Sequence, residues 1–319
     1  MIRRPPAPRH AGITLLEVLL ALGLGLVVLL IVDRIYTAST RSYDLQQALA
    51  RLQEGGRAAV NLISQDLRQA GHYGITDVEA AAALGRLVGS RPPAASCPMG
   101  NDRWGRMALQ PLFGLNDDAT AYACLSGRWV RGDVVTVRYA DPAPVTTYGN
   151  LLHFRSELYR GTLFVGPPAG APAPPASDHR MVARAYFVGR SRNAVGPRSC
   201  EGIPIPALVR ETLGTGGVPV AEEVVAGVEQ LQLRYGVDED GDGWVDRYVD
   251  AGDPPLDTLA GWSQVRSVRL WVLVRSECPD PFHKDTRTYE LGDAPPYQPN
   301  DAFHRALYRT SVALRNPLP

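Results

Sequence analysis

Acidic and glycine residues crowd the stretch "DEDGDGWVD", which runs from Asp238 to Asp246. Asp238, Asp240 and Asp242 occupy alternate positions, and Asp246 follows four residues later. A hard cation such as Ca²⁺ needs several oxygen ligands from a sharply curled backbone, and this spacing follows the ligand order of an EF-hand loop. We therefore predict a Ca²⁺ site whose ligands are Asp238, Asp240, Asp242, Asp246 and the carbonyl oxygen of Trp244.

The end of this loop departs from the EF-hand pattern. Val249 stands where the pattern has Glu, although Asp250 is one place later and could replace the missing carboxylate. Without a cation the neighbouring carboxylates would repel one another. The alternative is a solvated hairpin turn in which Asp and Gly only supply turn chemistry.

A second carboxylate, Glu17, lies in the apolar run from Ile13 to Val32. A run of about 20 apolar residues is what a helix needs to cross the hydrocarbon core of a bilayer. The basic flank of Arg3, Arg4 and Arg9 predicts a cytoplasmic N-terminus, with the rest of the chain on the other side. No A-x-A-like site follows the run, which argues against an ordinary signal peptide. An ionisable residue within such a span indicates a function, the alternative being a Glu that snorkels to the interface.

The segment "AGITLLEVLLALG" resembles the processing signal of type IV prepilins, with a short basic leader, Gly12, an apolar residue and Glu at the fifth mature position. The resemblance implies that a prepilin peptidase cuts after Gly12 and that Ile13 becomes an N-methylated terminus. It also implies that Glu17 pairs with the terminal amine of a neighbouring subunit. The apolar helix is then retained, first as a membrane anchor and later as a packing element of a filament.

Helical periodicity continues beyond the apolar run. Apolar or small residues recur at spacings of three and four, as one face of an amphipathic helix requires; they are Leu45, Leu49, Leu52, Gly56, Ala59, Ile63, Leu67 and Ala70. We predict a cytoplasmic leader over 1–12, a single helix over 13–70 with a membrane segment over 13–32, and a C-cap at Gly71.

The pattern of the rest of the chain, residues 71–319, predicts short strands separated by proline and glycine residues. The alternating segments "DVVTVRYA", "LQLRYGV" and "VRLWVLVRS" predict half-buried antiparallel strands, the last with Val268, Leu270, Val272 and Val274 facing the core. The proline-rich segment 166–177 predicts a loop. The expected fold is therefore α+β: one long helix, its first half in the membrane, packed on a mainly antiparallel periplasmic domain.

Five segments resemble the PilW family of minor pilins, in the same order: "DLRQAGHYG", "GDVVTVRYA", "YGVDEDGDGWVDRY", "VRLWVLVRS" and "VALRN". Between residues 160 and 218 the match is loose, so the strand order there stays open. The resemblance implies a minor pilin that helps to initiate or cap a type IV pilus, whether that filament serves twitching, adhesion or DNA uptake. Its implied partners are other minor pilins, the major pilin, the peptidase, the inner-membrane assembly machinery and a tip adhesin. The alternatives are a J-type minor pseudopilin of type II secretion and a tip module for adhesion or DNA binding.

Four cysteines follow the anchor, and none forms a C-x-x-C motif. In an oxidising compartment, an even number of cysteines with no C-x-x-C motif favours disulfides over a zinc site. We favour Cys97 with Cys124, which close a short loop-rich segment, and therefore Cys200 with Cys278. The alternative is four free thiols.

Composition argues against two other classes of function. The 33 basic and 33 acidic residues balance, Lys284 is the only lysine, and the arginines are scattered, so no nucleic-acid surface is expected. The sequence lacks H-E-x-x-H, G-x-S-x-G, phosphate-loop and dinucleotide motifs, so we expect no enzyme and no cofactor other than Ca²⁺.

Overall fold

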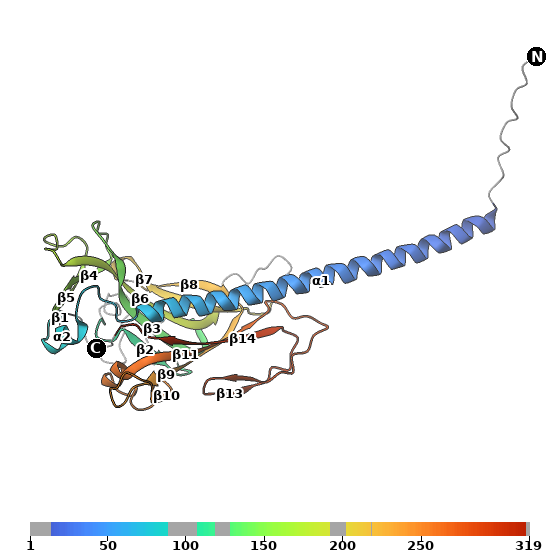
Figure 1. Ribbon diagram of the computed structural model, residues 1–319. Coiled ribbons are helices and arrows are strands. Elements are labelled where there is room, and N and C mark those ends of the chain that lie inside the picture. The colour runs from blue at the N-terminus through green and yellow to red at the C-terminus, as the bar shows by residue number, and fades with distance from the viewer. Residues whose placement is uncertain (1–13, 89–106, 119–127, 192–201, 218, 317–319) are drawn as a thin grey trace, which may run out of the picture. The chain divides into compact units, whose positions relative to one another are not determined.

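The structure is a computed structural model that describes residues 14–88, 107–118, 128–191, 202–217 and 219–316 (Figure 1). Its contacts divide the chain into two units, residues 1–50 and 51–319. The long helix α1 (Leu15–Gln69) begins in the first unit and ends in the second.

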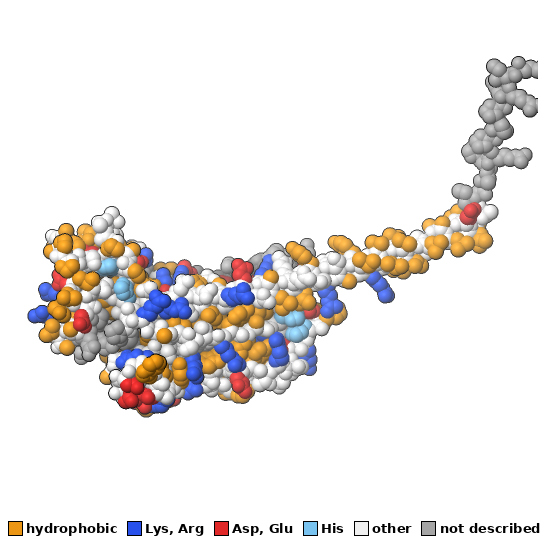
Figure 2. All heavy atoms as spheres, viewed as in Figure 1, with side chains coloured by type: hydrophobic (Ala, Val, Ile, Leu, Met, Phe, Trp, Pro, Cys, Tyr) orange, Lys and Arg blue, Asp and Glu red, His pale blue; other side chains and the backbone are white. Residues whose placement is uncertain are grey.

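The part of α1 in the first unit is apolar and exposed. Thr14 precedes the helix, and its hydroxyl accepts a hydrogen bond from the N–H of Glu17 at 3.3 Å, which satisfies one free donor of the first turn. The helix contains a stretch near the N-terminus that is long and apolar enough to cross a membrane, and none of that stretch is buried within the chain. Figure 2 shows apolar side chains along this part of α1. Among the described residues, none covers this apolar surface.

The part of α1 in the second unit buries one face, as the periodicity predicts. Leu52, Gly56, Ala59, Ile63 and Leu67 are buried at spacings of three and four. A side chain on Gly56 would collide with the ring of Tyr308, so glycine lets the helix approach this ring closely. Gly71 follows the helix with φ of 77°, a left-handed conformation that glycine adopts at low cost.

An eight-stranded sheet forms the larger layer of the second unit. Its path is β1-β5-β4-β6-β3-β2, with β7 beside β6 and β8 beside β7. The strands are β1 (Leu87–Val88), β2 (Leu112–Leu115), β3 (Trp129–Pro144), β4 (Leu152–Glu157), β5 (Arg160–Val165), β6 (Ser177–Arg190), β7 (Pro206–Leu213) and β8 (Pro219–Ala226). Among these pairs only β1 and β5 run parallel. The short helix α2 (Val78–Ala83) precedes β1, and the 3-10 turn η1 (Thr215–Gly217) precedes β8.

A four-stranded antiparallel sheet of order β10-β9-β11-β14 forms the second layer. Its strands are β9 (Val228–Val237), β10 (Arg247–Val249), β11 (Val265–Arg275) and β14 (Arg305–Ala313), with the 3-10 turn η2 (Ala260–Gln264) before β11. The hairpin of β12 (Tyr289–Leu291) and β13 (Ala294–Tyr297) packs on Trp271 and Leu307 of this sheet.

The main core joins residues 52–70 at the end of α1 to both sheets. Val268, Leu270, Val272 and Val274 are all buried there, as their alternation predicts. The predicted loop over 166–177 contains no helix or strand before Ser177. In the region where the sequence left the strand order open, β6 and β7 pair as antiparallel neighbours. The predicted α+β class, a long N-terminal helix on mainly antiparallel sheets, is confirmed.

Candidate functional site

Glu17 stands in the first turn of α1, and its side chain is exposed. The partial positive charge at a helix N-terminus favours a carboxylate in this turn. Gly12 and Ile13, the predicted processing residues, lie outside the described residues. The structure thus places one acidic side chain among the exposed leucines of α1, where a partner outside the chain can reach it.

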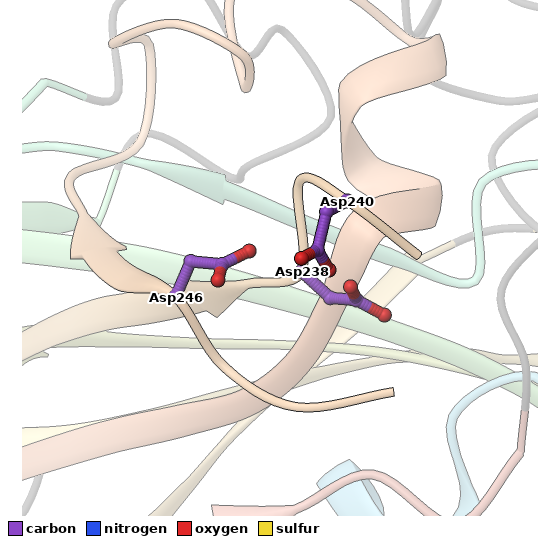
Figure 3. Close-up of side chains that lie close together, drawn as sticks. All are labelled: Asp238, Asp240 and Asp246. Carbon is purple, nitrogen blue, oxygen red and sulfur yellow. The ribbon is translucent and has the colours of Figure 1, made fainter. Parts of the chain in front are cut away.

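The acidic loop between β9 and β10 gathers three of the predicted ligands. Asp238, Asp240 and Asp246 each offer a carboxylate oxygen within 4.8 Å of the others (Figure 3). Asp238 is buried at the end of β9, whereas Asp240 and Asp246 are exposed. Oxygens this close could share a cation, and the hard carboxylate donor set suits Ca²⁺.

Backbone hydrogen bonds fold this loop around Asp238. Its carboxylate accepts hydrogen bonds from the N–H groups of Gly241 at 2.8 Å and Gly243 at 3.0 Å. Arg266 of β11 donates to the same carboxylate at 3.0 Å. Burial opposes ionisation, but these hydrogen bonds and the charge of Arg266 outweigh it and lower the pKa of Asp238. The carboxylate is therefore held ionised at the base of the loop.

Asp242, one of the predicted ligands, is not part of this group. Its carboxylate accepts a hydrogen bond from the N–H of Trp244 at 2.8 Å, which is a local turn contact. The carbonyl oxygen of Trp244 stays a predicted ligand. Asp250, the predicted substitute, accepts a hydrogen bond from Arg234 at 2.6 Å instead. Among the described residues, the carboxylate group of the loop thus comprises Asp238, Asp240 and Asp246.

A buried carboxylate that sequence reasoning missed fixes α1 to the large sheet. Asp66 of α1 accepts hydrogen bonds from Tyr139 of β3 at 2.8 Å, Arg184 of β6 at 2.7 Å and Tyr186 of β6 at 2.5 Å. Burial and the charge of Asp66 raise the pKa values of both tyrosines, so their hydroxyls remain donors. The available signal was a charged residue on the otherwise apolar face of the predicted helix.

A second contact that the sequence did not reveal closes the end of α1. The side-chain amide of Asn316, in the closing "LRN", donates to the carbonyl oxygens of Arg68 at 3.4 Å, Gln69 at 3.5 Å and Ala70 at 3.0 Å. The last carbonyls of a helix have no partner within the helix, so this amide satisfies acceptors that would otherwise need water.

Cys278 is disulfide-bonded. Cys97, Cys124 and Cys200 lie outside the described residues, so the pairing stays a prediction.

One comparison with known proteins, a family model, agrees with the sequence motifs. A type IV-like pilin from Thermus thermophilus shows 17% identity and a TM-score of 0.28, covering 59% of this chain and 80% of its own. No curated protein matches the chain. Residues 185–316 match the family of type IV pilus-assembly protein W. The predicted resemblance to the PilW family is therefore confirmed over residues 185–316.

Proposed function

We propose that the chain is a minor pilin that is anchored in the inner membrane by the first half of α1 and then assembles into a type IV pilus. The observation that carries this proposal is the exposed apolar part of α1, with Glu17 in its first turn, in a chain whose residues 185–316 match the PilW family. An apolar helix surface of this length needs lipid or other apolar helices around it.

The proposed route begins with the N-terminus in the cytoplasm and the β-rich domain in the periplasm. The prepilin peptidase removes residues 1–12, and Ile13 becomes the methylated terminus. The subunit then joins other minor pilins and the major pilin in a complex that initiates or caps the filament. In this assembly the Glu17 carboxylate forms an ion pair with the terminal amine of a neighbouring subunit. A low-dielectric surrounding strengthens this ion pair.

We also propose that the acidic loop binds Ca²⁺ through Asp238, Asp240 and Asp246. The proximity of their carboxylates supports this proposal. Bound Ca²⁺ would remove the repulsion between these groups and stiffen the connection between β9 and β10.

N-terminal sequencing of the mature protein tests the pilin assignment. We expect a start at Ile13 in wild-type cells and an intact leader in the Gly12→Val variant, because the peptidase must accept a residue with no side chain at this point. A mature protein that begins after Val32 would mean an ordinary signal peptide and would overturn the assignment.

A further inference from the structure

Two arginines lie side by side at the end of the large sheet where β1, β4 and β5 meet. β1 and β5 pair in parallel with Leu87 opposite Gly161, and the N–H of Gly161 donates to the carbonyl oxygen of Arg86 at 3.2 Å. The preceding residues, Arg86 and Arg160, therefore stand opposite each other. Like charges in this arrangement destabilise a sheet.

These arginines line an open cleft of about 500 Å³ together with Glu157 and Tyr159. Glu157 faces Arg160 across the β4–β5 hairpin, so one carboxylate flanks the two guanidinium groups. Within the part of the chain that the structure describes, neither arginine forms an ion pair within 4.0 Å. The lining thus carries two positive charges and one negative charge, and a carboxylate ligand would neutralise the remaining positive charge.

Exposed apolar side chains lie at or next to the lining residues in the sequence. Leu158 and Tyr159 at the tip of the β4–β5 hairpin are each 51% exposed, and Leu84 after α2 is 56% exposed. The N–H of Asp77 donates to the carbonyl oxygen of Leu158 at 2.9 Å, which brings the segment before α2 to the hairpin tip. Figure 2 shows apolar and basic side chains together at this end of the second unit.

We propose that this cleft binds an acidic, partly apolar polypeptide segment of a partner protein. A segment carboxylate would lie between Arg86 and Arg160, and its neighbouring apolar side chains would cover Leu84, Leu158 and Tyr159. A free anion or an anionic glycan would leave these apolar side chains in water, so a polypeptide fits the surface better. The proposal does not depend on the role of the chain in a pilus.

A labelled five-residue peptide of alternating leucine and aspartate, acetylated and amidated at its ends, tests the site. Its binding to the full chain in nanodiscs is followed by fluorescence anisotropy, beside a peptide with asparagine in place of aspartate. We expect saturable binding of the aspartate peptide only. Arg86→Ala and Arg160→Ala should each weaken it about tenfold, the loss of one charge-assisted hydrogen bond. Arg180→Ala, which removes an exposed arginine of β6 outside the cleft, should leave the affinity unchanged.

The substituted side chains are exposed, so each variant should fold. Circular dichroism of each variant checks this. Equal binding of both peptides, no saturable binding, or an equal loss in Arg180→Ala would overturn the proposal. Binding of sialyllactose in place of the aspartate peptide would assign the cleft to anionic glycans and would overturn it as well.

Discussion

The side-chain amide of Asn316 donates a hydrogen bond to the main-chain carbonyl oxygen of Ala70 at 3.0 Å, across 246 positions of sequence. The same amide reaches the carbonyl oxygens of Arg68 and Gln69. Together with the left-handed Gly71, it ends α1 at the point where the chain enters the β-rich domain. The C-terminal segment therefore helps to set where the long helix stops.

Replacing this cap should lower stability. We expect Asn316→Ala to reduce the free energy of unfolding by about 1 kcal/mol, because the carbonyl oxygens lose a hydrogen-bond donor at a partly buried position. Asn316→Asp should cost more, because a carboxylate repels these oxygens. Chemical denaturation of the full chain in detergent measures both, with the exposed neighbour Arg315→Ala as the control. If all three variants had the same free energy of unfolding as the wild type, the Asn316 amide would contribute nothing to stability.

Replacing Asp66 should lower the free energy of unfolding more than replacing Asn316 does. Asp66→Ala leaves the guanidinium of Arg184 and the hydroxyls of Tyr139 and Tyr186 without their shared acceptor. Arg184 keeps 27% of its side chain exposed, which limits the penalty to about 2–3 kcal/mol of unfolding free energy.

Denaturation curves of Asp66→Ala and of the exposed control Asp257→Ala provide the measurement. Tyr186→Phe removes one donor and should cost about 1 kcal/mol. Unfolding of Asp66→Ala at the wild-type denaturant concentration would contradict the anchoring role.

Stability should fall in acid through Asp285. Burial alone would raise the pKa of this carboxyl, but hydrogen bonds from Arg287 and Tyr289 outweigh it and lower the pKa to about 2. A folded-state pKa below the unfolded value stabilises the protein above pH of about 4, and the benefit is lost as the pH falls through about 2. From this pKa shift, the ionised Asp285 carboxylate contributes about 2 kcal/mol to the free energy of unfolding.

The comparison of wild type with Asp285→Asn isolates this group. The wild type should be more stable at pH 6, and the difference should shrink toward pH 2. A difference that does not change with pH would mean that Asp285 ionises alike in the folded and unfolded states.

Ca²⁺ should raise the melting temperature of the chain. We expect Asp240→Asn together with Asp246→Asn to abolish the increase, because both carboxylates belong to the close group of the loop. Asp242→Asn is the matched control, since the Asp242 carboxylate lies outside that group, and it should keep most of the increase. If millimolar Ca²⁺ did not change the melting temperature, the proposed Ca²⁺ site would be wrong and the loop would be a simple turn.

Periodic and local features were predictable from the sequence, whereas contacts between distant segments were not. The spacing of Leu52, Ile63 and Leu67 predicted the buried face of α1, and alternation predicted the core side of β11. Contacts such as those of Asp66 and Asn316 join residues far apart in sequence, and periodicity does not identify the partners.

Within the acidic loop, the alternation of aspartates predicted a convergence that is only partly reached. Short-range hydrogen bonds of Asp side chains to nearby backbone N–H groups compete with it, as in the contact between Asp242 and Trp244. The parallel pairing of β1 was also missed, because a two-residue strand is too short to show alternation.

Glu17→Ala tests the central claim that this chain acts by assembling into a type IV pilus. Removing the carboxylate makes the apolar segment easier to insert, so cleavage and membrane insertion should be normal. Only assembly should suffer, because the terminal amine of a neighbour loses its partner in a low-dielectric surrounding. A subunit that acts at initiation should change the number of pili more than their length.

The decisive measurement counts surface pili by electron microscopy while a secreted-protease assay is run on the same strain. The pilin assignment predicts few pili and poor twitching in Glu17→Ala cells, as in cells that lack the gene, with protease secretion unchanged. A J-type pseudopilin predicts the reverse, normal pili with protease retained in the periplasm. That reverse result, or normal results in both assays, would contradict the proposed role.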